Sequence, residues 1–155
     1  MKRLNELYKV DSDVLIKGIS INSNDINEGD IFVCIKGNKV DRHDYIDDAI
    51  KNGAVALVTA KEVNSSVPYV IVENPNEEVG RLAREIYDNP QDKLKLFAVT
   101  GTDGKTSVAT ITSQLIGNDK CGYIGTNGMS CAKIKEDTNN TTTSIEKLYK
   151  LFREF

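Results

Sequence analysis

The sequence predicts an α/β fold, because short continuous apolar runs alternate with segments whose apolar residues recur at helical spacing. The apolar runs, each bounded by turn residues, lie at 31–35, 54–58, 69–72 and 94–100. The helical patterns lie at 44–52, 76–87, after Gly104, and at 145–155. Alternation of this kind is typical of a sheet with helices packed on its faces.

The N-terminal elements carry weaker signals. A short helix is expected over 4–8, followed by two short strands at 14–16 and 19–21. Residues 27–30 are expected to form a turn that precedes the strand at 31–35. The helix over 44–52 has acidic residues near its start, and Gly53 follows it as a left-handed closing residue. The helix over 76–87 follows Asn74, a good N-cap, and Pro75, which suits a first helical turn.

A domain boundary is expected at 89–92, where Pro90 stands among polar residues between a helix and a new strand. Residues 1–90 then form one small domain. Residues 93–155 are expected to hold a strand, a helix with Val108, Ile111 and Leu115 on one face, a strand of the same sheet at 121–124, and a helix opened by a capping box from Thr143 to Glu146. That is less than an α/β layer normally needs to cover its sheet, so the second domain is expected to be incomplete.

Composition excludes several classes of protein. The 155 residues carry 20 Lys+Arg and 23 Asp+Glu, and a net charge of −3 without a basic cluster argues against nucleic-acid binding. No apolar run is long enough to span a membrane and no signal peptide is evident, so a cytoplasmic protein with no membrane partner is expected. The three cysteines are scattered and His43 is the single histidine, which disfavours a disulfide scaffold and a zinc site. His43 is expected to be solvated or to cap a helix, with no catalytic role.

The strongest motif runs from Thr100 to Ser107, between an apolar strand and an amphipathic helix, which is the setting of a phosphate-binding loop. In such a loop the backbone N–H groups and the helix N-terminus surround phosphate oxygens, the lysine reaches the β- and γ-phosphates, and the following hydroxyl ligates Mg²⁺. Val99 stands where the usual pattern has its first glycine. We predict ATP and Mg²⁺ as cofactors, with Thr106 as a metal ligand and the phosphates held by Thr100, Gly101, Thr102, Asp103, Gly104, Lys105, Thr106 and Ser107.

The shortened glycine pattern resembles the ATP loop of the Mur ligases, which form amide bonds in peptidoglycan precursors. The preceding segment sharpens the resemblance, because 21–24, 28–33, Gly37, Asp41 and 49–54 are similar to the N-terminal UDP-binding domain of MurE-type ligases, the UDP-N-acetylmuramoyl-tripeptide synthetases. The resemblance implies a small UDP-binding α/β domain followed by the beginning of a P-loop-type α/β central domain. A full-length member has three domains and is much longer.

The resemblance also implies positions for the UDP-sugar. They are Ile21, Ser23, the loop Asn38, Lys39 and Val40, and the muramoyl-binding stretch Asn140, Thr141 and Thr142. The departures from the family pattern are Asn22 and Asn24 in place of Asp and Arg, Arg42 in place of Gly, and Thr143 in place of Pro. Replacement of an arginine by Asn24 removes a charge-assisted bond near a diphosphate.

The implied function is that of the N-terminal portion of an ATP-dependent ligase. The ligase adds a diamino acid to its partner, UDP-N-acetylmuramoyl-L-alanyl-D-glutamate, and no catalytic residue is assigned within this chain. Alone, the chain is expected to be inactive and to need the remainder of the ligase, or another partner, to complete the central domain. The alternative from another class is a stand-alone module that binds a UDP-sugar or nucleotide without ligase activity.

Overall fold

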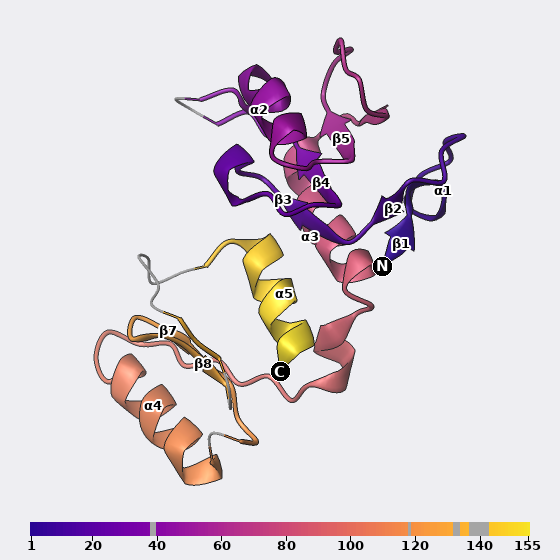
Figure 1. The fold of residues 1–155 in the computed structure, drawn as a ribbon. Helices are drawn as coiled ribbons and strands as arrows, with labels where there is room; N and C mark the ends of the chain where they lie inside the picture. Colours follow the sequence, from indigo (N-terminus) through magenta and orange to yellow (C-terminus); the bar gives the residue numbers. More distant parts are fainter. Residues whose placement is uncertain (38–39, 118, 132–133, 137–142) are drawn as a thin grey trace. The chain divides into compact units, whose positions relative to one another are not determined.

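The computed structural model describes residues 1–37, 40–117, 119–131, 134–136 and 143–155 (Figure 1). The chain separates into two compact units, Met1–Pro90 and Gln91–Phe155, which we call unit 1 and unit 2. No helix within the described ranges has the length and apolar character needed to cross a membrane.

Unit 1 is built on a four-stranded sheet of β3 (Gly18–Ser20), β4 (Asp30–Val33), β5 (Ala56–Thr59) and β6 (Tyr69–Ile71), in the order β3-β4-β5-β6. All three pairings are parallel, and the register places Ile19 opposite Ile31 and Val58 opposite Val70. The predicted α/β fold is confirmed, with strand bounds within two residues of the expected ones. Because the strands are parallel, their carboxyl ends lie along one side of the sheet, which we call the carboxyl edge.

One face of this sheet packs against α2 (Ile46–Lys51), which follows a single 3₁₀ turn, η2 (Arg42–Tyr45). Phe32 lies on β4, and Cys34 follows that strand directly. Both share a buried cluster with Ile46 and Ala49 of α2, which belongs to the crossover from β4 to β5. The expected helix over 44–52 is therefore confirmed with a 3₁₀ start. Gly53 ends it at φ 114°, a value that side chains other than glycine rarely adopt.

The helix α3 (Pro75–Ile86) packs against β3 and β4. Asn74 caps it, because its side chain accepts a hydrogen bond of 3.2 Å from the backbone N–H of Asn76. The buried face comprises Val79, Leu82, Ala83 and Ile86. The helix and its cap match the sequence prediction, with bounds shifted by one residue.

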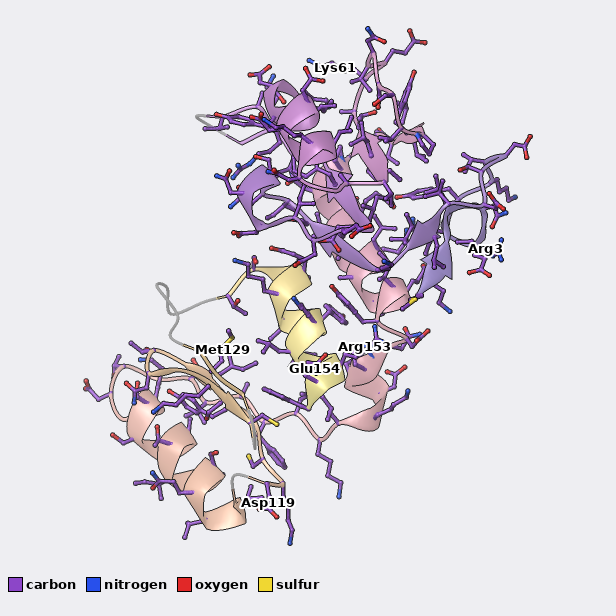
Figure 2. The ribbon with its side chains drawn as sticks, in the orientation of Figure 1. Arg3, Lys61, Asp119, Met129, Arg153 and Glu154 are labelled. Carbon is purple, nitrogen blue, oxygen red and sulfur yellow. The ribbon has the colours of Figure 1, made fainter. Side chains whose placement is uncertain are left out.

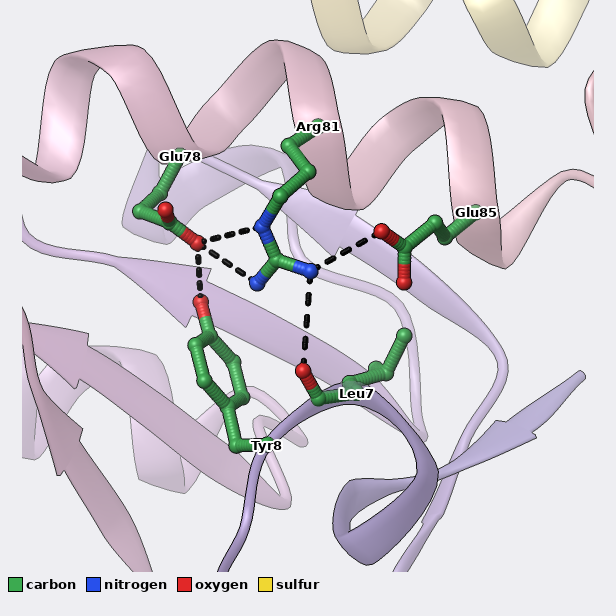
Figure 3. A network of polar contacts seen from close by, with 5 residues as sticks. All are labelled: Leu7, Tyr8, Glu78, Arg81 and Glu85. Carbon is green, nitrogen blue, oxygen red and sulfur yellow. Dashed lines mark hydrogen bonds and ion pairs between the residues drawn. The ribbon is translucent and has the colours of Figure 1, made fainter.

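The N-terminal segment forms a small antiparallel pair, β1 (Lys2–Arg3) and β2 (Leu15–Ile16), with the one-turn helix α1 (Leu4–Leu7) after β1. Tyr8, which follows α1, is joined to α3 by a network of polar contacts around Arg81 (Figure 3). The Arg81 guanidinium carbon lies 4.8 Å from the centre of the Tyr8 ring. These contacts fasten the N-terminal segment to the main helix of unit 1.

Unit 2 contains α4 (Lys105–Ile116), the strands β7 (Tyr123–Gly125), β8 (Gly128–Cys131) and β9 (Ile134–Glu136), and α5 (Ile145–Glu154). The strands form an antiparallel sheet in the order β7-β8-β9. Met129, labelled in Figure 2, is buried on β8. The strand predicted at 121–124 is thus present as β7, but it pairs in an antiparallel meander with β8 and not in one sheet with a strand over 94–100.

The prediction of a strand over 94–100 is wrong, because these residues form no strand. The chain makes a 3₁₀ turn, η3 (Pro90–Lys93), and then runs without strand pairing to the start of α4. Phe97 is 80% exposed, and no strand in the described ranges pairs with this run. An apolar sequence favours a strand only where a neighbouring strand supplies hydrogen bonds and cover, and neither is found here.

The predicted apolar face of α4 is also not buried. Val108, Ile111 and Leu115 are exposed, and Leu115 keeps 82% of its accessible surface. The helix instead contacts β7, and its buried residue is Ser113. The side of α4 that carries Ser113 therefore faces the sheet, and the larger apolar side chains of the helix are exposed to solvent.

The capping box predicted from Thr143 to Glu146 is not formed. The N-cap is Ser144, with extended angles of φ −69° and ψ 154°, so Glu146 is the second helical residue and not the third. A capping box needs its acidic residue at the third position. The Ser144 hydroxyl instead donates to the Glu146 carboxylate.

Candidate functional site

The glycine loop occupies 100–104 and leads directly into α4. Gly104 is the N-cap of the helix, with φ 76° and ψ −5°, and Gly101 has φ 142°. A Cβ atom on Gly104 would meet no heavy atom within 4 Å, so the need for glycine comes from the backbone angle and not from space. The two glycines bend the loop so that the first turn of α4 presents its N–H groups, which have no partners within the helix.

Lys105 is the first residue of α4, and its side chain folds back over the loop. The ammonium nitrogen Nζ donates to the carbonyl oxygens of Gly101 at 2.5 Å and Thr102 at 3.0 Å. Residues 100–105 are all exposed. A phosphate that binds this lysine must replace the loop's own carbonyl oxygens as its acceptors.

Thr106, the predicted metal ligand, is the second residue of α4 and is half-buried. The described ranges hold no group of three or more His, Cys, Asp or Glu side chains that could enclose a metal ion. Mg²⁺ typically binds through one or two protein ligands together with waters and substrate phosphates. A single hydroxyl beside the phosphate loop therefore suits a magnesium ion that arrives with a nucleotide.

A second candidate site lies at the carboxyl edge of unit 1. Ser23, 3% exposed, opens a 3₁₀ turn (η1, Ser23–Asp25) shortly after β3 ends, and half-buried Ile21 directly follows the strand. The Asn22 side chain caps this turn by accepting a 3.3 Å hydrogen bond from the backbone of Asn24. In parallel sheets, ligands bind in crevices outside the carboxyl ends of the strands. The position of Ser23 is consistent with the predicted UDP-sugar contact.

The turn at Ser23 is held in place from α2. The Asn52 side chain, at the C-cap of that helix, donates from Nδ2 to the Ser23 carbonyl oxygen at 2.8 Å. The two residues are 29 positions apart, so the contact has no local sequence signal.

The segment after β4 reaches the same edge. Lys36 and Asp41 form an isolated antiparallel bridge, and the Gly37 N–H donates to the Val40 carbonyl oxygen at 2.9 Å. Val40, a predicted UDP-sugar contact, is exposed. The predicted contacts Asn38, Lys39, Asn140, Thr141 and Thr142 lie outside the described residues.

His43 joins this segment to the end of β5. Its Nε2 accepts a 3.2 Å hydrogen bond from the Ala60 N–H, so Nδ1 carries the proton and donates to Asp41 Oδ1 at 2.5 Å. The His43 side chain is 6% exposed, so the expectation of a solvated histidine is wrong. Hydrogen bonds from the His43 backbone N–H and then its ring lower the pKa of Asp41. Lys61, labelled in Figure 2, lies 3.9 Å from the other oxygen of Asp41.

Comparisons with known proteins identify the family. Residues 15–94 match a profile described as "Mur ligase family, catalytic domain", and residues 99–154 match one described as "Mur ligase middle domain". The chain belongs to the Mur ligase family. The border between the two matches falls in the segment 95–98, just before the glycine loop.

Curated relatives of this Mur ligase chain include UDP-N-acetylmuramyl-tripeptide synthetase 2 of Oceanobacillus iheyensis, 37% identical over 136 residues, which are 84% of this chain and 28% of the relative. The UDP-N-acetylmuramoyl-L-alanyl-D-glutamate–2,6-diaminopimelate ligase of Fusobacterium nucleatum is 38% identical over 152 residues, 94% of this chain and 31% of the relative. The chain therefore spans about a third of the length of these relatives.

Solved structures give the same family. The MurF ligase of Thermotoga maritima in complex with ADP is 34% identical, with a TM-score of 0.52 over 68% of this chain and 24% of that one. A UDP-N-acetylmuramoyl-L-alanyl-D-glutamate–2,6-diaminopimelate ligase shares the fold over 99% of this Mur ligase chain and 33% of its own, with a TM-score of 0.69 at 22% identity.

The sequence prediction missed His43 and Asn52 as residues that hold the predicted UDP-sugar segments in place. For His43 a signal exists, because an aspartate favours a local turn in which its side chain accepts a hydrogen bond from the backbone two residues later. For Asn52 no such signal exists, since its partner is a backbone carbonyl brought close by the fold.

Proposed function

We propose that the chain is the substrate- and phosphate-binding portion of a MurE-type, ATP-dependent ligase of the cytoplasm, and that it binds UDP-N-acetylmuramoyl-L-alanyl-D-glutamate. The observation that carries the proposal is the succession, in one chain, of a parallel sheet with the Ser23 turn at its carboxyl edge and a glycine loop at the start of α4. The relatives whose names state this substrate are matched across both parts.

In this proposal unit 1 binds the UDP part of the substrate. Ser23, Ile21 and Val40 support it, because they come from segments that follow neighbouring strands at one edge of the sheet. Asn38 and Lys39, and the muramoyl-binding stretch Asn140, Thr141 and Thr142, remain part of the proposal on the strength of the family pattern. Nucleotide recognition at a sheet edge needs few side chains, since loop backbones supply donors and acceptors.

The glycine loop binds the ATP phosphates in this proposal. Lys105 exchanges its contacts with the Gly101 and Thr102 carbonyl oxygens for phosphate oxygens, and Thr106 offers its hydroxyl to Mg²⁺. Bound Mg²⁺ would supply positive charge next to the transferring phosphoryl group. The γ-phosphoryl group passes to the substrate carboxylate as ADP leaves, and the amine of a diamino acid then displaces phosphate to form the amide.

These 155 residues alone should not complete that reaction. Residues 100–105 are exposed, and Lys105 is held by its own loop, whereas phosphoryl transfer needs an enclosed site that fixes all reactants. The second candidate function is a binding module that holds a UDP-sugar without ligating it. The buried core of unit 1 favours this alternative, because the UDP site there does not depend on the glycine loop.

Calorimetry with the 155-residue chain tests the proposal. UDP-N-acetylmuramoyl-L-alanyl-D-glutamate is titrated into the wild type, the variant Ser23→Ala and the control Ser66→Ala, whose serine is exposed. Loss of one hydrogen bond should weaken binding by about 1 kcal/mol, about fivefold, in Ser23→Ala alone. ATP with Mg²⁺ should bind the wild type weakly and Lys105→Ala not at all. Absence of UDP-substrate binding by the wild type would refute the proposed function.

A further inference from the structure

The crossover from β4 to β5 carries a polar side chain at each of its ends, and each of them holds backbone of a segment that is predicted to contact the nucleotide. His43 lies in η2, where the crossover begins, and Asn52 caps α2, where it ends. His43 connects Asp41 to the end of β5, and Asn52 holds the turn at Ser23. The same crossover thus contacts two segments of the candidate nucleotide site.

The Asn52 contact is separable from the fold. The connection from β3 to β4 is also fastened by a backbone hydrogen bond of 3.0 Å from the Gly29 N–H to the Gly53 carbonyl oxygen. Gly53 packs so closely on Glu28 that a Cβ atom would lie 2.9 Å from the Glu28 Cα. Without the Asn52 side chain these backbone contacts remain, and what is lost is the restraint on the Ser23 turn.

The His43 contacts are separable in the same way. Without the His43 ring, Lys36 and Asp41 still form their bridge, and the Arg42 N–H still donates a 3.1 Å hydrogen bond to the Ile35 carbonyl oxygen. The His43 ring adds a link from Asp41 to Ala60, at the end of the neighbouring strand β5. Its neutral imidazole donates at one nitrogen and accepts at the other, so both of its hydrogen-bonding atoms are used in positioning backbone.

We propose that His43 and Asn52 are positioning residues for the nucleoside diphosphate of the substrate. The inference rests on the proposed function. Neither side chain has to touch the ligand, since each acts through Asp41 or Ser23. A loop that is already held in its bound conformation loses less conformational entropy on binding, and the benefit appears in the ligand affinity.

Isothermal titration of UDP into the full 155-residue chain tests this inference with Asn52→Ala, His43→Ala and His43→Asn. Each alanine variant should raise the dissociation constant for UDP about fivefold, because binding must then order a segment that the wild type already holds in place. His43→Asn places an amide N–H near the position of Nδ1 and keeps a donor for Asp41, so it should recover part of the affinity.

Ile86→Val is the stability control. Ile86 is fully buried in α3, and the change should cost about 1 kcal/mol of folding free energy without touching either contact. It should leave the dissociation constant for UDP unchanged, whereas Asn52→Ala should weaken binding at a smaller loss of stability. In amide NMR spectra, the shift changes of Asn52→Ala should be confined to 22–25 and 52–53.

The outcomes separate the two proposals. Wild-type protein that does not bind UDP would refute the proposed function and this inference together. Wild-type protein that binds UDP, with alanine variants that bind equally well, would overturn the inference and leave the function standing. If His43→Ala does not fold, His43→Asn and Asn52→Ala decide the result.

Discussion

The Tyr8 phenol donates a 2.7 Å hydrogen bond to Glu78 Oε2, across 70 residues of sequence. Arg81 completes the arrangement, with Nε and Nη2 donating to the same carboxylate oxygen at 2.9 and 2.6 Å (Figure 3). The guanidinium also donates to Glu85 at 2.9 Å and to the Leu7 carbonyl oxygen at 3.5 Å. The half-buried carboxylate of Glu78 thus accepts charge-assisted hydrogen bonds from Arg81 as well as the bond from Tyr8, and these contacts hold the N-terminal segment on α3.

Tyr8→Phe should therefore lower the free energy of unfolding by about 1 kcal/mol, because one hydrogen bond to a charged acceptor is lost while the ring stays in place. The chain has no tryptophan, so urea unfolding is followed by circular dichroism. Tyr45→Phe, at an exposed ring, is the matched control and should change stability by much less. Equal effects of the two variants would show that the network does not stabilise unit 1.

The same network predicts a pH dependence at the acid end. Burial alone raises the pKa of Glu78, but hydrogen bonds from Arg81 and Tyr8 outweigh it and bring the pKa below its usual 4.5. The stabilisation is present above pH 4.5 and is lost as pH falls through the lowered folded-state pKa. Wild-type protein should thus lose stability faster below pH 4.5 than Glu78→Gln. Parallel profiles would contradict this.

The parallel sheet could be predicted from the sequence because its signals are local. Runs such as 31–35 and 54–58 are apolar, bounded by turns and long enough for one strand. The helix α3 is equally local, because its N-cap Asn74 and the helical spacing of its apolar residues can both be read from one short stretch of sequence. The run 94–100 carries an equally strong signal and forms no strand. A strand depends on a partner elsewhere in the chain, which a local pattern does not report.

The candidate site residues also differ in whether a local sequence pattern reveals them. The glycine loop could be predicted down to Gly104, because the positive φ that the turn requires is met by the residue type itself. Ser23 could be placed only through the family pattern, since a serine among Asn and Asp is an ordinary turn residue. The contact of Asn52 with Ser23 could not be predicted, because it depends on how α2 lies on the sheet.

Cys34 should be unreactive in the folded chain. It is fully buried, and burial, followed by the Asp41 carboxylate, raises the pKa of its thiol to about 12. The thiolate is the reactive form, and Cys121 and Cys131 are partly exposed. A disulfide reagent at pH 8 should modify those two thiols first, and Cys34 only as unit 1 unfolds. Rapid modification of all three in native protein would show that the α2 face of the sheet is not closed.

The exposed run before the glycine loop predicts a cleavage site. Phe97 is 80% exposed in a segment without strand pairing, whereas Tyr87 and Phe32 are buried. Chymotrypsin should therefore cut first after Phe97, as identified by the masses of the products, and Phe97→Ser should slow that cut strongly. First cleavage within unit 1 would contradict this prediction. It would mean that unit 1 opens to the protease more readily than the segment 94–100 does.

The isolated 155 residues should show no ligation with ATP, UDP-N-acetylmuramoyl-L-alanyl-D-glutamate and any diamino acid. Acyl transfer requires the carboxylate, the γ-phosphate and the amine to meet where water is excluded, and the loop around Lys105 is open to solvent. Phosphate release is the measurement, with the Fusobacterium nucleatum ligase as the positive control and Lys105→Ala as the background. Release above that background by the wild-type chain would show that it encloses its reactants, by self-association or otherwise, and would overturn the proposal that these residues bind without catalysing.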